Sequence, residues 1–276
     1  PSSASPAAPS FPPARPEVET LQAYSAPLEG RRGLLRLDFN ENTVGPSPKV
    51  VEAIRAIPAD HYAIYPEYDG LREAVLASLA VTPGAIAHAV PAKASDRGVH
   101  GDTTALEAPT PRPALGIGQV GLFNGVDAAI HAVFQAYGAR GDRLLTTSPT
   151  FGYYTPCARM QGMEIEAIPY QMPGFLFPLE EIRAALTPPT SATDAWRPPR
   201  LLLLCNPNNP TGTRLAPEAV LALAVAAPDT LVVVDELYEA FTGDSVLPLL
   251  LGAGGQAVRL RDPAGPAAAD PTAAPV

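Results

Sequence analysis

Two short apolar runs with a helical segment between them constrain the fold of this chain more than any other feature. Leu201–Cys205 reads LLLLC and Leu231–Val234 reads LVVV. Continuous apolar runs of this length are typical of strands that are buried on both faces. Pro217–Ala226, between them, has the composition of a helix that crosses over a sheet. This order predicts an α/β fold with a largely parallel sheet.

Further periodic segments extend the pattern along the chain. Apolar residues recur at helical spacing over Pro48–Ile57, Leu71–Val81 and Asp127–Tyr137, and strands are predicted at Arg143–Thr147 and Glu164–Ile168. In sheets of this kind, ligands bind at the carboxyl ends of the strands. The candidate functional residues should therefore follow the apolar runs.

Proline-rich stretches mark the parts of the chain outside this domain. The 276 residues include 34 prolines. We predict a disordered Pro/Ala-rich tail at 1–20, a flexible insertion at 84–116 and a disordered low-complexity tail at 257–276, because these stretches lack hydrophobic periodicity. Residues 21–256 are then the folded part.

Composition excludes several classes of function. A net charge of −9 argues against a nucleic-acid partner. The longest apolar run, about nine residues, is far shorter than the roughly 20 that cross a bilayer, so no membrane span is expected. Cys157 and Cys205 have neither metal-ligand nor disulfide-framework spacing, which favours no metal and a reducing compartment such as the cytoplasm. The Ser/Ala-rich start without acidic residues is also compatible with the remnant of a transit peptide to a plastid or another organelle.

Polar motifs follow both apolar runs. Asn206–Gly212 reads NPNNPTG, and its two Asn-Pro steps favour a rigid, non-helical loop that can hold an amide in one direction. Asp235–Tyr238 reads DELY and places a carboxylate at the end of a strand. Each motif alone also fits an ordinary turn or a solvated acid.

Together, the two motifs closely resemble the fold-type-I pyridoxal-phosphate aminotransferases of class I/II, and most of all the histidinol-phosphate aminotransferase branch. Four earlier segments resemble that branch in order and spacing: LDFNENTVGPSPKVVEAI at 37–54, YPEYDGLREAVLASLAV at 65–81, FNGVDAAI at 123–130 and PTFGYYTPCARMQG at 149–162. The resemblance covers roughly residues 35–250. It implies the large domain of that fold, a mixed and mostly parallel sheet with flanking helices.

The resemblance also implies a site for pyridoxal 5′-phosphate. Backbone N–H groups at Gly125, Val126 and Asp127, at the start of a helix, would hold the phosphate, and Phe151 would stack on the pyridine ring. Tyr65 would reach the phosphate of a neighbouring subunit, which makes the working unit a homodimer.

Other residues are assigned to the ring and the substrate in the same way. Asn209 and Tyr238 would hydrogen-bond the phenolic oxygen of the ring, and Asp235 would pair with the protonated ring nitrogen. Three residues would lie near the substrate: Asn40, Glu41 and Asn42. The implied reaction transfers an amino group between an amine or amino acid and a 2-oxo acid such as 2-oxoglutarate.

The chain departs from the family at the phosphate turn and after Asp235. Phe123 stands where the family has glycine, and a bulky side chain is expected to reshape that turn. The lysine that forms a Schiff base with the cofactor is absent, since no lysine follows Lys93. Lys49 and Lys93 are expected to be surface residues.

We therefore expect a chain that is C-terminally truncated before this lysine, that lacks the small C-terminal domain and that is inactive as a fragment. Two alternatives stay open. One is an enzyme similar to threonine-phosphate decarboxylase, and the other is a non-catalytic cofactor-binding or scaffold fragment.

Overall fold

The computed structural model describes residues 13–21, 29–37, 39–66, 68, 70–80, 116–189 and 196–252. The α-helices are α1 (Pro16–Glu19), α2 (Pro48–Arg55), α3 (Leu71–Ala80), α4 (Gly125–Tyr137), α5 (Tyr154–Met160), α6 (Leu179–Leu186), α7 (Pro217–Ala226) and α8 (Leu247–Gly252). The strands are β1 (Arg143–Ser148), β2 (Glu164–Pro169), β3 (Leu201–Cys205) and β4 (Leu231–Asp235). Short 3-10 helices are η1 (Arg31–Gly33), η2 (Ala59–Ala63), η3 (Ile117–Gln119) and η4 (Glu239–Phe241).

The four strands form one sheet in the order β2-β1-β3-β4. Every pairing is parallel, and Leu201 lies opposite both Leu144 of β1 and Leu231 of β4. This confirms the predicted α/β fold with a parallel sheet. The predicted insertion at 84–116, apart from Gly116, and the predicted tail at 257–276 lie outside the described residues.

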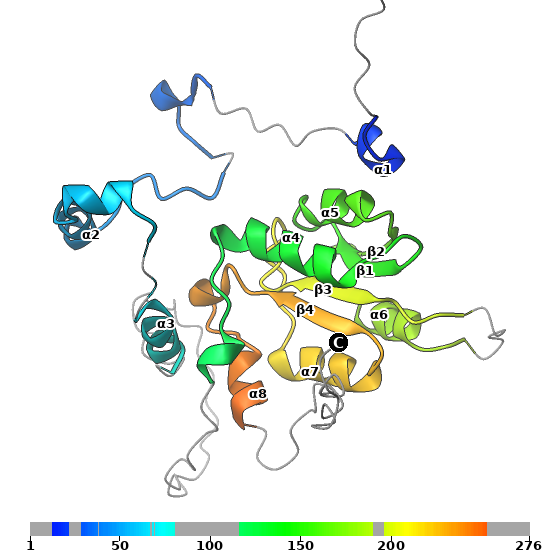
Figure 1. Ribbon diagram of the computed structural model, residues 1–276. Coiled ribbons are helices and arrows are strands. Elements are labelled where there is room, and N and C mark those ends of the chain that lie inside the picture. The colour runs from blue at the N-terminus through cyan, green and yellow to red at the C-terminus, as the bar shows by residue number, and fades with distance from the viewer. Residues whose placement is uncertain are drawn as a thin grey trace, which may run out of the picture.

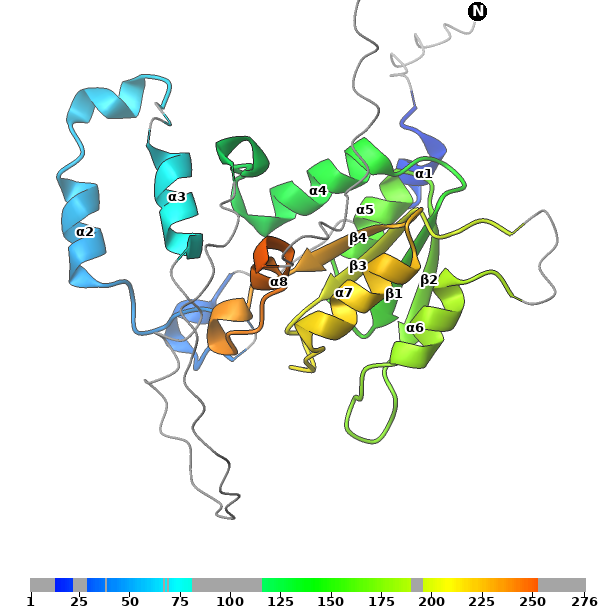
Figure 2. The same cartoon turned by 90° about the horizontal axis from the view of Figure 1, so that it is seen from below.

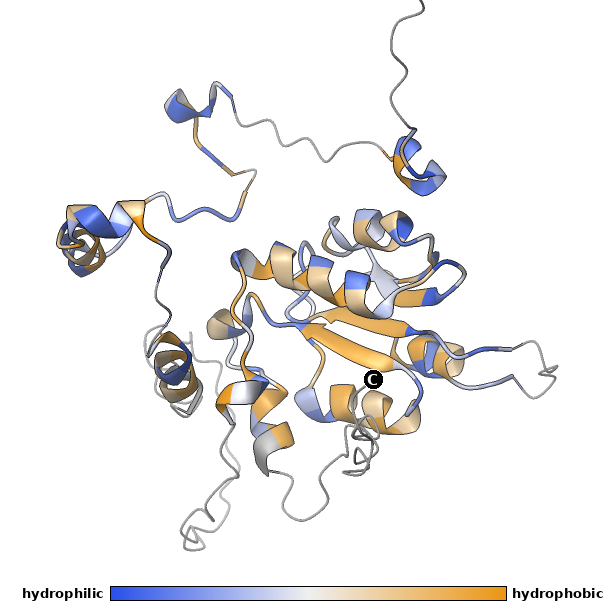
Figure 3. Ribbon diagram, in the orientation of Figure 1, coloured by the Kyte–Doolittle hydropathy of each residue, from blue (hydrophilic) through white to orange (hydrophobic). Residues whose placement is uncertain are grey.

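Helices cover both faces of the sheet (Figure 1). Alternate residues of β3 point to opposite faces, so Leu203 packs with Phe134 of α4 on one side, while Leu202 and Leu204 pack with Leu223 of α7 on the other. β3 and β4 are accordingly the apolar centre of the molecule (Figure 3). Burial of each leucine side chain stabilises the fold by about 1.5–3 kcal/mol.

The N-terminal end of the described chain is anchored on this domain. Helix α1 packs against α5. Arg15 donates a hydrogen bond from Nη2 to the Met160 carbonyl oxygen at 2.8 Å, and Glu17 forms an ion pair with Arg140. The prediction that 1–20 is a disordered tail therefore differs from the structure at 13–20, because a charged and a polar contact hold this segment. Residues 1–12 lie outside the described part.

Helices α2 and α3 lie to one side of the sheet rather than on either face (Figure 2). No residue of α2 is buried, and its apolar residues Val50 and Ile54 are exposed to solvent, as is Ile57 just after the helix. Within the described segments, none of the helices combines the length and the apolar character needed to cross a bilayer.

Candidate active site

The carboxyl ends of β1, β3 and β4 bring the predicted ring-binding residues to one edge of the sheet. Phe151 follows β1, Asn209 follows β3, and Asp235 is the last residue of β4, opposite Cys205 of β3. The loops after β1 and β3 are joined directly, since Asn208 donates from Nδ2 to the Pro149 carbonyl oxygen at 3.0 Å. The edge predicted to hold the ligand is therefore a single, connected surface.

Asp235 is a buried carboxylate whose two oxygens are each held by one neutral donor. Its residue is only 7% exposed. The Tyr154 hydroxyl donates to Oδ2 at 2.7 Å, and the Leu237 backbone N–H donates to Oδ1 at 3.1 Å. Among the described residues no Lys, Arg or His forms an ion pair with it. A buried carboxylate without a cation is costly, so this edge favours a cationic ligand group.

Tyr154 is a neutral hydrogen-bond donor over the whole working pH range. Burial raises the pKa of its hydroxyl far above the ordinary value, and the nearby Cys205 and Asp235 raise it further. The ring of Phe151 meets the Tyr154 ring edge-on, with centroids 5.6 Å apart and an angle of 83°. The Phe151 ring thus packs against the ring whose hydroxyl donates to Asp235.

The three asparagines of the loop after β3 have different roles. Asn206 donates to the Leu215 carbonyl oxygen and accepts from the Leu215 N–H, both at 2.9 Å. Asn208 accepts from the Thr150 hydroxyl at 2.8 Å and donates to the Thr211 hydroxyl at 2.8 Å. Both are buried, and both ends of each amide are bonded within the protein, Asn206 inside its own loop and Asn208 partly to the loop after β1.

Asn209 is the exception in this loop. It is half-buried, and its side-chain amide makes no hydrogen bond to the part of the chain that the structure describes. Its backbone N–H contacts the Cys205 sulfur at 3.4 Å. Since the loop does not use its amide, Asn209 is the asparagine available to a ligand, as the resemblance implies.

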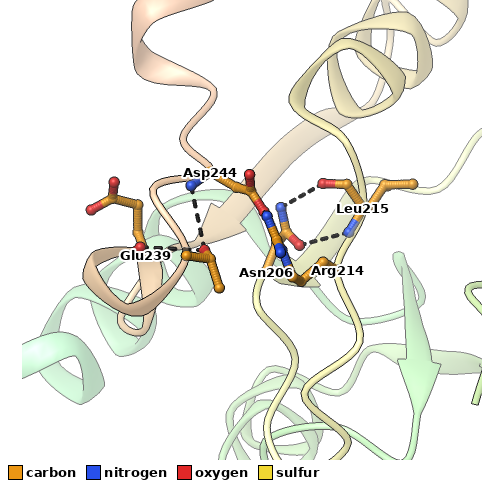
Figure 4. A network of polar contacts seen from close by, with 6 residues as sticks. Asn206, Arg214, Leu215, Glu239 and Asp244 are labelled. Carbon is orange, nitrogen blue, oxygen red and sulfur yellow. Dashed lines mark hydrogen bonds and ion pairs between the residues drawn. The ribbon is translucent and has the colours of Figure 1, made fainter. Parts of the chain in front are cut away.

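The loops that follow β3 and β4 are joined to each other by polar contacts (Figure 4). Arg214 forms an ion pair with Asp244, and the Thr242 hydroxyl accepts from the Asp244 N–H at 3.3 Å. Glu236 accepts from the Ser245 hydroxyl and the Val246 N–H, each at 2.7 Å. Burial raises the pKa of Glu236, although these two bonds lower it in part.

The predicted phosphate turn opens α4 at the same end of the sheet as these loops (Figure 1). Gly125 has φ +78°, a conformation that favours glycine, and no side chain caps the first N–H groups of this 13-residue helix. Val126 packs on the core cluster that includes Cys205, while the Asp127 carboxylate is exposed. The Gly125 N–H donates to the Phe123 carbonyl oxygen at 2.9 Å, whereas free N–H groups at the start of a helix are suited to an anion.

The Phe123 side chain folds away from the predicted phosphate turn and does not fill it. Its side chain is about half-exposed, and its ring lies over Gly121, where a Cβ atom would come within 2.8 Å of the ring. The loss of the family's glycine at 123 is therefore accommodated by a ring that folds back over a neighbouring glycine.

One of the three predicted substrate residues reaches the site. Asn40 donates from Nδ2 to the Tyr238 hydroxyl oxygen at 2.7 Å. Glu41 instead pairs with Arg31 at 3.1 Å and Arg36 at 3.0 Å. Asn42 bonds only its own turn, to the Gly45 carbonyl oxygen and the Val44 N–H.

The remaining candidates lie away from this edge. Tyr65 follows η2 and is 96% exposed, without a contact to the ring-binding residues. Lys49 lies exposed on α2, and Lys93 falls outside the described residues. The described part of the chain holds no group of three or more His, Cys, Asp or Glu side chains that could bind a metal.

Sequence reasoning did not single out Tyr154. The only feature of the sequence that points to Tyr154 is its place three residues after Phe151, and this does not indicate which residue it contacts. The contact to Asp235 joins residues 81 positions apart, and such pairs follow from the packing of α5 on the sheet.

A match to a known family gives the class to which this α/β protein belongs. The family described as aminotransferase class I and II matches residues 116–256, and the chain belongs to this family. It is 33% identical over 218 residues to histidinol-phosphate aminotransferase of Methanococcoides burtonii, covering 79% of this chain and 49% of that protein. It is 34% identical over 216 residues to that of Symbiobacterium thermophilum, with 77% and 47% covered.

A solved structure supports the fold. The histidinol-phosphate aminotransferase from Sinorhizobium meliloti, in complex with pyridoxal-5′-phosphate, superposes with a TM-score of 0.58 at 23% identity, over 83% of this chain and 52% of that one. The fold is therefore that of the fold-type-I aminotransferases. The chain spans about half the length of the curated relatives it matches.

Proposed function

We propose that these residues form the cofactor-binding part of a pyridoxal-phosphate-dependent aminotransferase that acts on histidinol phosphate and a 2-oxo acid such as 2-oxoglutarate. The observation that carries the proposal is the buried Asp235 carboxylate, held by two neutral donors and paired with no cation among the described residues. The similarity to histidinol-phosphate aminotransferases supports the choice of substrate.

The donor set fits pyridoxal 5′-phosphate. A protonated pyridine nitrogen would supply the cation that Asp235 lacks, and the uncommitted amide of Asn209 would bond the phenolic oxygen of the ring. The N–H groups at Val126 and Asp127, after the positive-φ Gly125, suit a phosphate. When bound, the cofactor supplies an electron sink for the carbanion that forms as the substrate loses its α-proton.

The protein's own residues divide the remaining work. Asp235 would hold a proton on the ring nitrogen, and Phe151 would cover one face of the ring. Tyr238 would donate its hydroxyl proton toward the ring oxygen, because its own oxygen already accepts from Asn40. Tyr65, which is fully exposed, would contact the phosphate in a second copy, so the working unit is a homodimer.

The 276 residues by themselves do not complete the reaction. Transamination needs an amine beside the cofactor to carry the proton. Lys49 lies on the exposed surface of α2, away from Asp235, and no lysine follows Lys93. We therefore propose that this chain binds the cofactor without turnover.

The test uses the purified chain and pyridoxal 5′-phosphate. We expect saturable binding that Asp235→Ala and Asn209→Ala each weaken, and no peptide labelled stoichiometrically after borohydride reduction. An absence of binding contradicts the cofactor site. Stoichiometric labelling of Lys49 or Lys93 together with turnover contradicts the predicted inactivity.

The substrate is tested on the protein encoded when the reading frame beyond Val276 is included. If that frame supplies a lysine, we expect amino transfer from histidinol phosphate to 2-oxoglutarate. Release of CO₂ from threonine phosphate without such transfer would instead indicate a decarboxylase.

A further inference from the structure

Tyr154 lies behind Asp235, on the side of the carboxylate that belongs to the protein interior. It is 1% exposed, whereas Asp235 sits at the edge of the sheet. Its hydroxyl has one proton, and that proton is donated to Asp235 Oδ2 at 2.7 Å. The burial of Tyr154 leaves no route by which it could touch a ligand directly, so any effect on one must pass through Asp235.

Two donors on different oxygens fix the plane of the Asp235 carboxylate. Tyr154 holds Oδ2, and the Leu237 N–H holds Oδ1 at 3.1 Å. A carboxylate oxygen accepts more than one hydrogen bond, so acceptor capacity remains for a ligand. A bond from one side alone would leave the group free to turn about its Cβ–Cγ bond.

The same short segment also carries the aromatic face of the site. Phe151 and Tyr154 are three residues apart, and their rings meet edge-on at 5.6 Å. Because one segment positions both, the direction of the carboxylate is coupled to the plane on which a ring would stack.

We propose that Tyr154 is a positioning residue that aims the Asp235 carboxylate at the ring nitrogen of the bound cofactor. This inference rests on the proposed function. It predicts that the Tyr154 hydroxyl contributes to recognition of the ring nitrogen and to no other part of the cofactor.

The test compares two probes that differ only at that nitrogen. Pyridoxamine 5′-phosphate has an amine in place of the aldehyde and so does not bond to Lys49 or Lys93. Its 1-deaza analogue has a C–H group where the ring nitrogen stands. Equilibrium dialysis of the purified 276-residue chain with each compound gives two dissociation constants, and their ratio measures recognition of the nitrogen.

We expect the chain to prefer the nitrogen-containing compound by at least about tenfold, as for a charge-assisted hydrogen bond. Tyr154→Phe should reduce this ratio at least threefold and leave the affinity for the deaza analogue unchanged. Tyr170→Phe is the matched control, because its buried hydroxyl accepts from Thr147 and does not contact Asp235. Its ratio should equal that of the unaltered chain.

A second comparison guards against a folding defect in Tyr154→Phe. In an Asp235→Asn background no buried anion is left short of a donor, so removing the Tyr154 hydroxyl should not alter affinity for pyridoxamine 5′-phosphate. A further loss there would show a merely structural role and overturn the inference. The inference would also be overturned if Asp235→Asn abolished the preference for the nitrogen-containing compound while Tyr154→Phe left it unchanged. In that case the proposed function would stand. If the unaltered chain shows no preference, the role of Asp235 fails, and this inference fails with it.

Discussion

Asn40 donates a hydrogen bond to the Tyr238 hydroxyl oxygen at 2.7 Å, across 198 positions of sequence. The bond ties the segment before α2 to the loop after β4. It also sets the direction of the phenol, because an oxygen that accepts from Asn40 keeps its own proton for another acceptor. A single amide thus connects the N-terminal segment with the ring-binding edge.

The first prediction concerns this amide. Asn40→Ala removes one hydrogen bond worth about 0.5–1.5 kcal/mol, so affinity for pyridoxamine 5′-phosphate should fall roughly two- to tenfold. Limited proteolysis within 29–47 should also become faster. Asn42→Ala is the control, since its amide bonds only its own turn. Equal effects of the two substitutions would contradict the prediction.

The second prediction separates structure from binding within the NPNNPTG loop. Asn206→Ala strands the buried N–H and carbonyl of Leu215 and should lower the free energy of unfolding by about 1–3 kcal/mol. Asn209→Ala should change it by less than about 0.5 kcal/mol while weakening cofactor binding. Urea unfolding and equilibrium dialysis measure the two effects. A large loss of stability in Asn209→Ala would refute this division of roles.

The third prediction concerns pH. Burial raises the pKa of Glu236 in the folded chain, so the folded state binds the proton more tightly than the unfolded state. The protonated Glu236 therefore adds to the free energy of unfolding below the ordinary glutamate pKa of about 4.3. This contribution is lost as the pH rises through the pKa of Glu236 in the folded chain. Glu236→Gln should therefore show a flatter dependence of unfolding free energy on pH above about 4.3. Glu218→Gln, in the first turn of α7, is the control. An identical change of the pH dependence in both variants would contradict the assignment of that dependence to the burial of Glu236.

The fourth prediction uses the two thiols. Burial raises the pKa of both Cys157 and Cys205, and the thiolate is the reactive form. Ellman's reagent should therefore label the folded chain at least about a hundredfold more slowly than the unfolded chain. A Cys157→Ser variant assigns the two phases. Rapid labelling of either thiol without denaturant would show that this side of the sheet opens readily.

The fifth prediction concerns the exposed apolar residues of α2 and Ile57, which follows the helix. In the proposed homodimer, Val50, Ile54 and Ile57 would be covered by the second copy. Ile54→Asp should then shift the molar mass measured by light scattering from dimer to monomer, while Glu52→Gln on the polar face should not. A chain that is monomeric before any substitution contradicts the proposed dimer.

The sequence predicts most of the sheet because its strands carry unambiguous patterns. Leu201–Cys205 and Leu231–Val234 are apolar runs too short for helices, and the structure has strands at Leu201–Cys205 and Leu231–Asp235. Four helices were not predicted, and two of these, α1 and α8, are only four and six residues long. α5 contains Pro156 and begins within an aromatic run, so it has no clear apolar period. α6 is only eight residues long, although its apolar residues Leu179, Ile182 and Leu186 do recur at helical spacing.

Some residues of the candidate site are predictable from the sequence pattern, and others are recognised only from the packing of the folded chain. The positions of Asn209 and Asp235 at the carboxyl ends of β3 and β4 are predicted from the apolar runs, because strand ends are a local property of sequence, whereas their roles toward the ring are implied by the resemblance. The partners of Asp235 are not, because Tyr154 reaches it only through the packing of α5 on the sheet. The ion pairs of Glu41 with Arg31 and Arg36 were likewise invisible to a pattern that assigned Glu41 to the substrate.

The two ends of helix α5 contact different parts of the protein. At its start, Tyr154 holds the carboxylate of Asp235, and at its end, Met160 accepts from Arg15 beside the docked helix α1. Seven residues span only about 10 Å, so the helix acts as a short rigid strut. If the contacts of residues 13–19 with α5 were lost, the helix would shift and the Tyr154 ring would tilt. The N-terminal segment would thereby affect the position of the Asp235 carboxylate from the other end of the helix.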